Sequence, residues 1–331
     1  MKTEIQLFNQ DMLAEAGKLL ASRQARERVI FPALPKRFED VPIAAKAVET
    51  AFKKKSAFGF AAIRGGKLAA YLIGESTPLD WGRGGFIHLP GCGLAEGEDP
   101  ALLQDLYAFV GEEWNKRGCF LHYIYLPAGD PAVIDAWFSL GFGRERADAI
   151  LDLSAMDTPK RKPASDFGIR RSTAEDGKRL EELSDVIAVH QSRAPRWHPL
   201  LPEELTELAE GWAEIAGDPD WTIWLADTGT EVQGSIGFRA LPEADDDLTI
   251  PPKATDLTVA AVKEAARGRG IMSALTWHGL EHARNEGYEF CVTNWQTANL
   301  SASRTWPRFG FQTAAYRLAR TINPMSAWAK L

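Results

Sequence analysis

The run Arg267-Gly268-Arg269-Gly270 stands between an apolar segment, residues 257–262, and an amphipathic segment that begins at Ile271. These segments predict a strand and a helix joined by a tight turn. Small residues at such a turn let main-chain N–H groups crowd around an anion, and the positive end of the helix dipole adds to the attraction. The two guanidinium groups bring formal charge to the same place. The run predicts a phosphate or pyrophosphate site, although a tight turn without a ligand has the same composition.

Two common phosphate loops do not fit this run. A dinucleotide fingerprint requires Gly-x-Gly-x-x-Gly near the start of a βαβ unit, and Ser273 occupies the third glycine position. A nucleoside-triphosphate loop requires Gly-x-x-x-x-Gly-Lys-Ser/Thr, which the sequence lacks. We therefore expect a phosphorylated ligand that is bound in another way.

The elements that must position this turn continue downstream in a characteristic order. A helix to about Arg284 is followed by Gly287, a strand over 288–293 and a short helical segment over 301–309. This order resembles the acetyl-CoA-binding core of the GNAT superfamily of N-acyltransferases. The family pattern Arg/Gln-x-x-Gly-x-Gly/Ala is matched by Arg267, Gly270 and, imperfectly, Met272. Its second pattern, Asn-x-x-Ala-x-x-x-Tyr-x-x-x-Gly-Phe, is matched by Asn299, Ala302, Gly310 and Phe311, with Trp306 in place of Tyr.

The resemblance implies acetyl-CoA as co-substrate, lying between splayed strands at 256–262 and 288–294. The main chain of Ala260, Ala261 and Val262 would pair with the pantetheine amides. The pyrophosphate would be held by the turn and the first helical turn: Arg267, Gly268, Arg269, Gly270, Ile271, Met272 and Ser273. Asn299 would bond the pantetheine arm or bridge the splayed strands. A helix N-cap is the alternative role, and the two roles are compatible.

Asp256 is the candidate general base, because several relatives carry a Glu there that relays the acceptor's proton through water. Strand alternation predicts that Asp256, Thr258, Ala260 and Val262 share one face. A solvated residue at the end of a strand is the alternative for Asp256. Trp306 stands where relatives have a Tyr thought to protonate the leaving thiolate, and an indole N–H is not a usable acid near neutral pH. We assign that role to no other group.

The candidate acceptor site borders the loop after the first helix of the second half, as the resemblance implies. His190, Trp197 and His198 lie in this stretch, and Trp306 would complete the cleft. Ordinary surface or partly packed side chains are the alternative for each of them.

The same order of elements occurs twice. Placing Gly118 on Gly287, a shift of 169 (287 − 118), brings Asp130 onto Asn299 and Trp137 onto Trp306. A repeat of this size indicates duplicated domains. At the turn, the first copy has Glu98-Asp99-Pro100-Ala101, whose carboxylates would repel phosphates by about 1–4 kcal/mol per pair and whose proline has no N–H. We expect this degenerate copy not to bind CoA.

The expected fold is α+β, with two tandem GNAT-like domains, each a mixed, mostly antiparallel sheet of six to seven strands flanked by helices. The first domain would cover residues 1–157 and the second 166–323. The basic, proline-broken segment 158–165 is the expected linker.

Composition narrows the function further. The 331 residues carry a net charge of −7, which argues against nonspecific nucleic-acid binding. The three cysteines, Cys92, Cys119 and Cys291, are scattered without metal spacing and indicate reduced thiols in a cytoplasmic protein. No apolar stretch is long enough to span a bilayer. We expect no metal and no membrane partner, and either a monomer or a homodimer.

These patterns together predict an N-acetyltransferase. It would move an acetyl group from acetyl-CoA to an amine of a small molecule or peptide, by direct attack in the C-terminal domain. The alternative is a catalytically silent CoA-binding sensor or scaffold.

Overall fold

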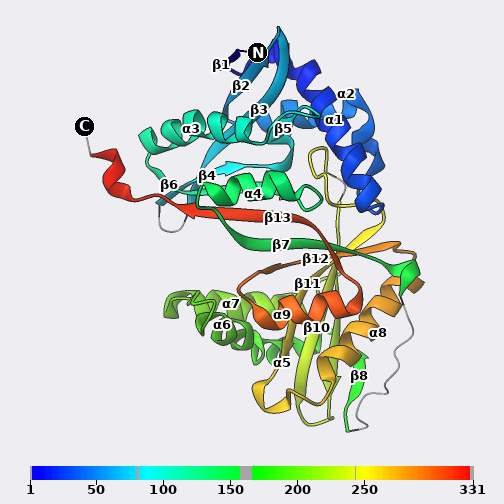
Figure 1. The fold of residues 1–331 in the computed structure, drawn as a ribbon. Coiled ribbons are helices and arrows are strands. Elements are labelled where there is room, and N and C mark those ends of the chain that lie inside the picture. Colours follow the sequence, from blue (N-terminus) through cyan, green and yellow to red (C-terminus); the bar gives the residue numbers. More distant parts are fainter. Residues whose placement is uncertain (1, 80–81, 157–165, 243, 329–331) are drawn as a thin grey trace. The chain divides into compact units, whose positions relative to one another are not determined.

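The computed structural model describes residues 2–79, 82–156, 166–242 and 244–328 (Figure 1). The predicted linker 158–165 lies outside the described residues. The chain forms two compact units: unit 1 comprises Met1–Asp148, Glu243–Pro251 and Thr313–Leu331, and unit 2 comprises Ala149–Pro242 and Pro252–Gln312. Both units are discontinuous in sequence, whereas the expected domains 1–157 and 166–323 are contiguous.

Unit 1 is a mixed sheet with helices packed on it. Its helices are α1 (Leu13–Ile30), α2 (Val41–Phe52), α3 (Ala101–Lys116) and α4 (Pro131–Ser139). Its strands are β1 (Thr3–Leu7), β2 (Phe58–Arg64), β3 (Lys67–Leu79), β4 (Gly82–Ile87), β5 (Cys92–Leu94), β6 (Cys119–Pro127), most of β7 (Gly143–Asp152) and β13 (Gln312–Thr321). The strand order is β1-β2-β3-β4-β6-β13-β7, and β5 pairs with β3. Neighbours in this order are antiparallel at β1–β2, β2–β3, β3–β4 and β6–β13, whereas β4 runs parallel to β6.

The hairpin between β2 and β3 follows directly from its sequence. Gly65 and Gly66 adopt φ values of 55° and 76°, which suit the tight two-residue turn that a pair of glycines favours.

Helix α3 packs closely on the sheet, where a Cβ on Gly85 would lie 2.3 Å from the ring of Trp114. The fully buried Trp114 therefore requires glycine beneath it.

Unit 2 repeats this architecture. Its strands are β8 (Gly168–Arg171), β9 (Trp221–Asp227), β10 (Val232–Ala240), β11 (Ala254–Val262), β12 (Phe290–Gln296) and the end of β7. Its helices are α5 (Gly177–Glu181), α6 (Ser184–Ser192), α7 (Pro202–Glu214), α8 (Ile271–Asn285) and α9 (Leu300–Thr305). The order β12-β11-β10-β9-β8 is antiparallel apart from β11–β12. The expected α+β architecture with mixed, mostly antiparallel sheets is confirmed.

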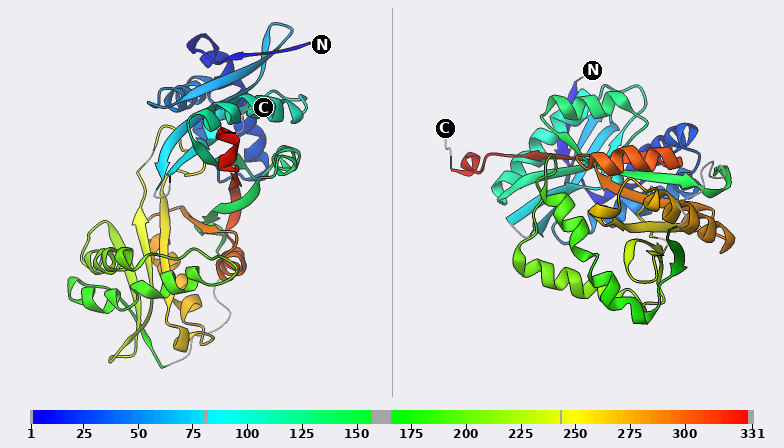
Figure 2. Two further views of the ribbon diagram at one scale, coloured as in Figure 1. Left: turned by 90° about the vertical axis from the view of Figure 1, so that its left-hand side faces the viewer. Right: turned by 90° about the horizontal axis from the view of Figure 1, so that it is seen from below.

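Helices cover both faces of the unit 2 sheet (Figure 2). On one face, the ring of Phe238 lies against Gly279 of α8, and Trp224 packs edge-on against His278 with ring centroids 4.2 Å apart. On the other face, Leu180, Leu183 and Trp212 from α5, the α5–α6 junction and α7 form a core with Ala261 and other strand residues. The helical segment after β8 is broken into α5 and α6 between Glu181 and Ser184.

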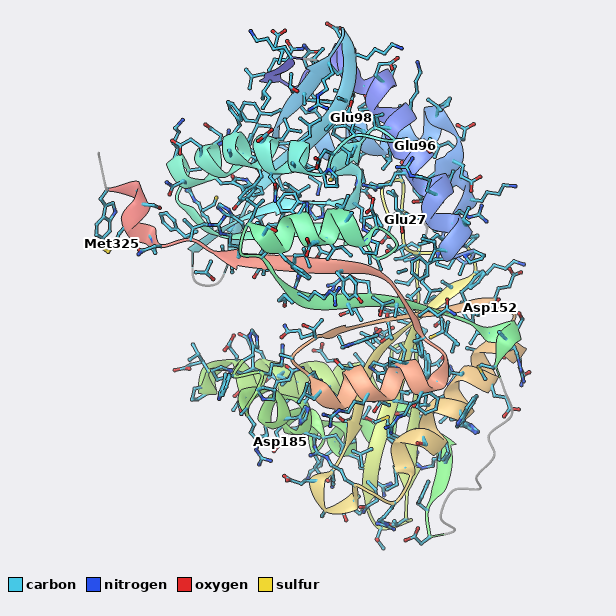
Figure 3. All side chains as sticks on the ribbon, viewed as in Figure 1. Glu27, Glu96, Glu98, Asp152, Asp185 and Met325 are labelled. Atoms are coloured by element: carbon cyan, nitrogen blue, oxygen red, sulfur yellow. The ribbon has the colours of Figure 1, made fainter. Side chains whose placement is uncertain are left out.

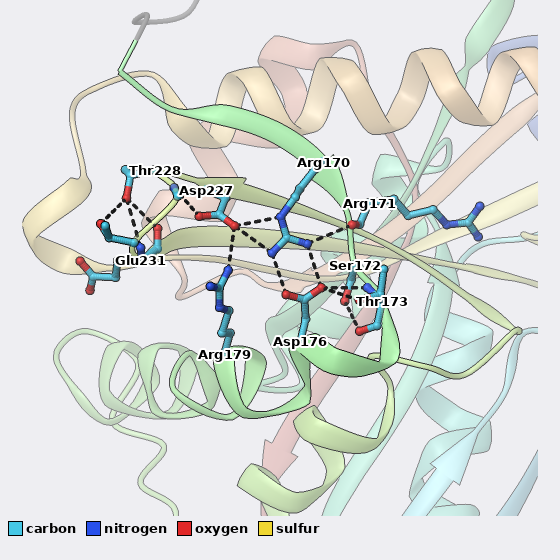
Figure 4. Close-up of polar contacts among 11 residues, drawn as sticks. Arg170, Arg171, Ser172, Thr173, Asp176, Arg179, Asp227, Thr228 and Glu231 are labelled. Carbon is cyan, nitrogen blue, oxygen red and sulfur yellow. Dashed lines mark hydrogen bonds and ion pairs between the residues drawn. The ribbon is translucent and has the colours of Figure 1, made fainter.

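An ion-pair network anchors the start of unit 2 (Figure 4). The guanidinium of Arg170 on β8 donates to both carboxylate oxygens of Asp176, at 2.7 and 2.8 Å, and to Asp227 on β9 at 2.8 Å. Arg179 on α5 also donates to Asp227, at 2.9 Å. The network ties the first strand, the first helix and the neighbouring strand together.

The last strand of the chain lies in unit 1. Residues Ala315–Thr321 of β13 pair antiparallel with Pro127–Leu121 of β6. The sequence placed this strand in the second domain, because it follows Gly310 and Phe311 just as β7 follows Gly141 and Phe142. The two final strands have equivalent patterns, so the pattern alone does not determine which sheet each one joins.

The internal repeat is visible in the local geometry. Gly118 and Gly287 both have left-handed φ values, 74° and 91°, at the end of α3 and α8. Gly141 and Gly310, before the final strand of each copy, have φ values of 84° and 95°. A residue other than glycine is strained in this region, so each glycine marks an obligatory turn. The glycines that the 169-residue shift aligns therefore share a left-handed backbone conformation.

Candidate active site

Strands β11 and β12 separate partway along their length. Their parallel pairing covers Ala254 with Phe290, Thr255 with Cys291 and Asp256 with Val292. Beyond that point β11 continues to Val262 and β12 to Gln296 with no further ladder pairs between these described segments. The gap leaves main-chain groups at the end of β11 available to a ligand on that side.

A β-bulge accompanies this separation. Gly237 of β10 pairs with Val259, and the next residue, Phe238, pairs with Leu257. Thr258 is therefore the extra residue on β11. Bulges bend a strand and increase its twist, which moves the end of β11 relative to the regular ladder.

The bulge corrects the predicted distribution of side chains on β11. Ala260 pairs with Ile236, and Val262 pairs with Gly234, so both lie on the α8 face with Leu257. Asp256 pairs with Arg239 and lies on the opposite face, the side of α5–α7. The expectation that Asp256 shares a face with Ala260 and Val262 is therefore wrong, because simple alternation fails across a bulge.

The predicted anion turn connects β11 to α8. Gly268 and Gly270 have φ values of 79° and 81°, and a Cβ at either position would meet no atom within 4 Å. Glycine is thus required by backbone conformation rather than by space. Gly270 is the N-cap of α8, and no side chain caps the helix there. The first N–H groups of α8, on Ile271, Met272 and Ser273, have no side-chain acceptor from a cap and face the end of the turn.

The two arginines of the turn already have partners. Arg267 donates from Nε to the carbonyl oxygen of Val262 at 3.3 Å, which folds its side chain back toward the end of β11. Arg269 forms an ion pair with Asp166. Both side chains lie at the surface, so each guanidinium retains N–H groups that can turn toward an anion.

Asn299 begins helix α9 as its N-cap. Its Oδ1 accepts from the main-chain N–H of Ala302 at 3.2 Å, and Nε2 of His190 lies 3.2 Å from the same oxygen. The capping role weighed from the sequence is thus present. The contact with His190 was not foreseen, because 109 residues separate the two.

The loop between α6 and α7 lies near the ends of β11 and β12. Arg193 forms an exposed ion pair with Glu264, in the segment between β11 and the anion turn, with 3.2 Å between Nη1 and Oε2. Arg196 donates to Gln296 at the end of β12. The structure thus brings this loop to the region where the resemblance expects the acceptor.

The predicted acceptor residues differ in their surroundings. Trp197 is 71% exposed and has a φ of 44°, unusual for a residue with a side chain. His198 is half-buried, and its main-chain N–H donates to Gln191 at 2.9 Å. Trp306 is buried, with its ring packed on Phe309 and Phe311 at centroid distances of 6.3 and 6.0 Å. This packing makes Trp306 a core residue in the described structure.

Asp256 sits at the last paired position of β11 and β12, where the strands begin to diverge. Its carboxylate accepts from the hydroxyl of Thr258 at 2.9 Å and is only partly buried. Burial raises the pKa of the Cys291 thiol well above its ordinary value, and the charge of Asp256 raises it further. A carboxylate in this position can exchange protons with a group or water on the α5–α7 face.

Unit 1 has a different set of groups at the equivalent turn. The carboxylate of Asp99 accepts from the N–H of Ala101 at 2.9 Å, so the start of α3 already holds an anion. Glu98, which is labelled in Figure 3, forms an ion pair with Arg64. Asp130 repeats the capping role of Asn299 by accepting from the N–H of Val133 at 3.1 Å.

Side chains of α1 form hydrogen bonds with main-chain groups near β5 and in the loop after β6. Arg23 donates to the carbonyl oxygens of Leu89, at 2.9 Å, and Cys92. Glu27 accepts from the N–H of Gly129 at 3.0 Å, and burial raises the pKa of its carboxyl. The sequence predicted the carboxylates at the turn of the first copy. It did not predict the contacts of Arg23 and Glu27, because contacts between α1 and distant loops leave no local pattern in the sequence.

Among the described residues, the structure has neither a metal-binding cluster nor a membrane-spanning helix. No cluster of three or more His, Cys, Asp or Glu side chains among the described residues is arranged to hold a metal ion. Within the same residues, no helix has the length and apolar character needed to cross a membrane.

Known proteins resemble this chain in sequence and in fold. The family model for the acetyltransferase (GNAT) family matches residues 186–311. Mycothiol acetyltransferase of Rhodococcus erythropolis is 29% identical over 140 residues, 40% of this chain and 43% of that protein. N-acetyltransferase 8B of Homo sapiens is 35% identical over 112 residues, 34% of this chain and 46% of that protein. Each match thus spans less than half of the relative's length.

The structural matches cover far more of the chain. A GCN5-related N-acetyltransferase from Sphaerobacter thermophilus has a TM-score of 0.58 at 16% identity, covering 97% of this chain and 96% of that one. A tandem GNAT protein from the clavulanic acid biosynthesis pathway has a TM-score of 0.50 at 14% identity, covering 98% and 99%. At these identities the likeness concerns the fold. The acetyltransferase (GNAT) family model thus matches the chain at residues 186–311, and the chain shares its fold over nearly its whole length with two solved structures, one of them a tandem GNAT protein.

Proposed function

We propose that this protein transfers an acetyl group from acetyl-CoA to an amine of a small molecule or peptide, with the chemistry in the second copy. The observation that carries the proposal is the start of α8, which no side chain caps, at the turn that follows the diverging end of β11. This combination offers N–H donors for a pyrophosphate and strand main chain for an extended arm. The names of the matched relatives, both acetyltransferases, agree with acetyl transfer.

The cofactor-binding residues follow from this arrangement. The main chain of Ala260, Ala261 and Val262 would hold the pantetheine arm, and the anion turn would hold the pyrophosphate. The turn residues are Arg267, Gly268, Arg269, Gly270, Ile271, Met272 and Ser273. Asn299 would donate its amide to the arm. Bound acetyl-CoA supplies the activated thioester, and the protein's part is to hold it in place and exclude water.

Asp256 is the proposed base for the acceptor amine. It lies where the strands begin to part, and its bond from Thr258 fixes the carboxylate. The end of α6 with His190, and the α6–α7 loop with Trp197 and His198, would border the acceptor. A neutral amine would attack the thioester carbonyl directly, forming the C–N bond as the C–S bond breaks and CoA leaves as its thiolate. Asp256 would take the proton that the amine loses, through water.

The first copy would have no cofactor. The carboxylate of Asp99 at the start of α3 competes with any phosphate, and Arg23 covers carbonyls near β5. We propose that residues 1–157 form this degenerate copy and residues 166–323 the CoA-binding copy, joined by 158–165. The first copy would then have a structural role.

A silent CoA-binding sensor is the second candidate function. The burial of Trp306 among aromatic rings favours it, because no acidic hydroxyl stands at that position. The two candidates separate in a thiol-release assay with acetyl-CoA and a panel of amines. Acceptor-dependent release supports the transferase, whereas tight CoA binding without release across the panel supports the sensor. The free, buried cysteines agree with a reducing, cytoplasmic setting for either function.

The proposed coenzyme site is tested by calorimetry with acetyl-CoA. Gly270→Glu should abolish binding, because it places a carboxylate among the phosphate donors. Gly270→Gln has nearly the same size and the same backbone strain, about 1–3 kcal/mol, without the charge, and should lose much less affinity. Ala101→Glu, at the equivalent turn of the first copy, should leave the affinity unchanged. A wild-type protein with no affinity for CoA or acetyl-CoA would overturn the proposal.

A further inference from the structure

The two contacts to Asn299 determine how its amide is oriented. A main-chain N–H can only donate, so the atom that faces the N–H of Ala302 must be the oxygen of the amide. The same Oδ1 lies 3.2 Å from Nε2 of His190. An oxygen acceptor requires a proton on that nitrogen, so His190 must carry hydrogen on Nε2. Both lone-pair directions of Oδ1 are then occupied.

The nitrogen of the Asn299 amide, Nδ2, is available to donate to a ligand. Nδ2 of Asn299 has two hydrogens and donates to none of the described residues. Asn299 follows β12 by a short turn, on the strand that diverges from β11. With the oxygen held from two sides, rotation of the amide is restricted and its N–H groups point in a fixed direction.

The first copy provides an internal comparison. Glu27 lies in the last turns of α1, the first helix of its copy, and accepts from the N–H of Gly129, next to Asp130. His190 lies in the last turn of α6 and contacts Asn299, which the 169-residue shift aligns with Asp130. A carboxylate from the end of a helix thus lies beside the cap residue in one copy, whereas an imidazole contacts the cap amide in the other. Only the second arrangement offers a hydrogen-bond donor to a carbonyl.

We propose that His190 is a positioning residue, which fixes the amide of Asn299 so that Nδ2 donates to a carbonyl of the pantetheine arm. This inference rests on the proposed function of the second copy. Nε2 of His190 already carries a proton in this contact, so it cannot act as a general base.

The test compares two ligands that share the phosphates. Acetyl-CoA has the pantetheine arm, whereas adenosine 3′,5′-bisphosphate lacks it. Calorimetry should show that His190→Ala weakens acetyl-CoA binding by about three- to tenfold, the range for one lost hydrogen bond. Binding of adenosine 3′,5′-bisphosphate should stay within twofold of the wild type. His282→Ala, at the end of α8 opposite the anion turn, should change neither.

A double-mutant cycle identifies the partner. Asn299→Asp keeps the helix cap, as Asp130 does in the first copy, but removes the amide donor. Adding His190→Ala to Asn299→Asp should cost no further affinity, because the group that His190 positions is already gone. Fully additive losses, or an equal loss for both ligands in His190→Ala, would overturn the positioning role. If the wild type binds neither ligand, the proposed function itself fails.

The pH profile adds an independent readout. His190→Gln should partly restore affinity, since its amide can also donate. In a protein with acceptor-dependent turnover, the apparent pKa values of the kcat/KM profile should be the same in His190→Ala as in the wild type. Loss of one limb of the profile would instead make His190 an acid or base and contradict the inference.

Discussion

Arg269 of the anion turn forms an ion pair with Asp166, which lies just before β8. More than a third of the Arg269 side chain and more than half of the Asp166 side chain are exposed, at 36% and 56%. The contact places a carboxylate beside the turn where we propose that phosphates bind. Asp166 therefore competes with the ligand for this guanidinium.

Replacing Asp166 with Asn should tighten acetyl-CoA binding. A single charge at close range in water changes an interaction by about 1 kcal/mol, so we expect an increase of about two- to fivefold at low salt. Added salt should reduce the difference because it screens surface charges. Calorimetry at two salt concentrations checks this, with Glu289→Gln, in the exposed pair with Lys253, as the control. A weaker affinity in Asp166→Asn would mean that the carboxylate orders the turn instead of competing with the ligand.

Trp306 should behave as a core residue. Its ring is 7% exposed and packs on Phe311, so Trp306→Ala should cost about 3–5 kcal/mol of the free energy of unfolding. Trp306→Phe keeps an aromatic ring and should cost less than half as much. Trp197→Ala removes a side chain that is 71% exposed and should change stability by no more than about 0.5 kcal/mol. Urea denaturation of the three variants measures this order, and a Trp306→Ala protein as stable as the wild type would contradict it.

The sequence predicted the local structure of the site well, because that structure depends on short-range patterns. The left-handed turns at Gly268 and Gly270 follow from backbone freedom at glycine, and the cap at Asn299 follows from its place before a short helix. The divergence of β11 from β12 was expected from the family resemblance. The glycine turns and the cap are determined by residues close together in the chain, whereas the divergence was expected only from the resemblance.

The features that sequence analysis missed depend on contacts across long separations or on one extra residue. The bulge at Thr258 reverses the faces of Ala260 and Val262, and nothing in an apolar strand marks where a bulge falls. The pairing of β13 with β6 involves a choice between two sheets of similar pattern. His190 meets Asn299 only because α6 and α9 come together in the fold.

The ion-pair network at Arg170 should make unit 2 sensitive to acid. Hydrogen bonds from Arg170 lower the pKa of Asp176 well below its ordinary value, and Asp176 is 4% exposed. A depressed folded-state pKa contributes stability above the ordinary carboxyl pKa, about 3.9, and that stability is lost as the pH falls from there through the folded-state value. We expect Asp176→Asn to destabilise unit 2 by about 2–4 kcal/mol at neutral pH and to flatten the loss below about pH 4.

Hydrogen exchange of amides in β8 and β9 measures this effect within unit 2. Glu175→Gln changes the neighbouring, exposed carboxylate and is the matched control. It should leave both the stability and its pH dependence as in the wild type. Equal behaviour of Asp176→Asn and Glu175→Gln would show that the network contributes nothing measurable.

His122 should give unit 1 a separate dependence on pH. Burial lowers the pKa of His122 to about 4, and the side chain is 1% exposed. Its Nδ1 lies 2.7 Å from the hydroxyl of Tyr107, and its Nε2 lies 3.0 Å from the carbonyl oxygen of Cys119. A carbonyl only accepts, so Nε2 carries the proton and the hydroxyl of Tyr107 donates to Nδ1. The neutral ring therefore fits both partners.

The sign of the effect follows from the two protonation states. The unfolded chain takes up a proton near pH 6.5, whereas the folded protein resists until about pH 4, so stability falls as the pH drops between those values. The fall should approach about 3 kcal/mol, since each pKa unit corresponds to about 1.4 kcal/mol. His122→Asn should be less stable at neutral pH but should lose this part of the pH dependence. Hydrogen exchange of β6 amides between about pH 4 and pH 7 checks it, and parallel curves for the wild type and the variant would show that His122 is not the titrating group.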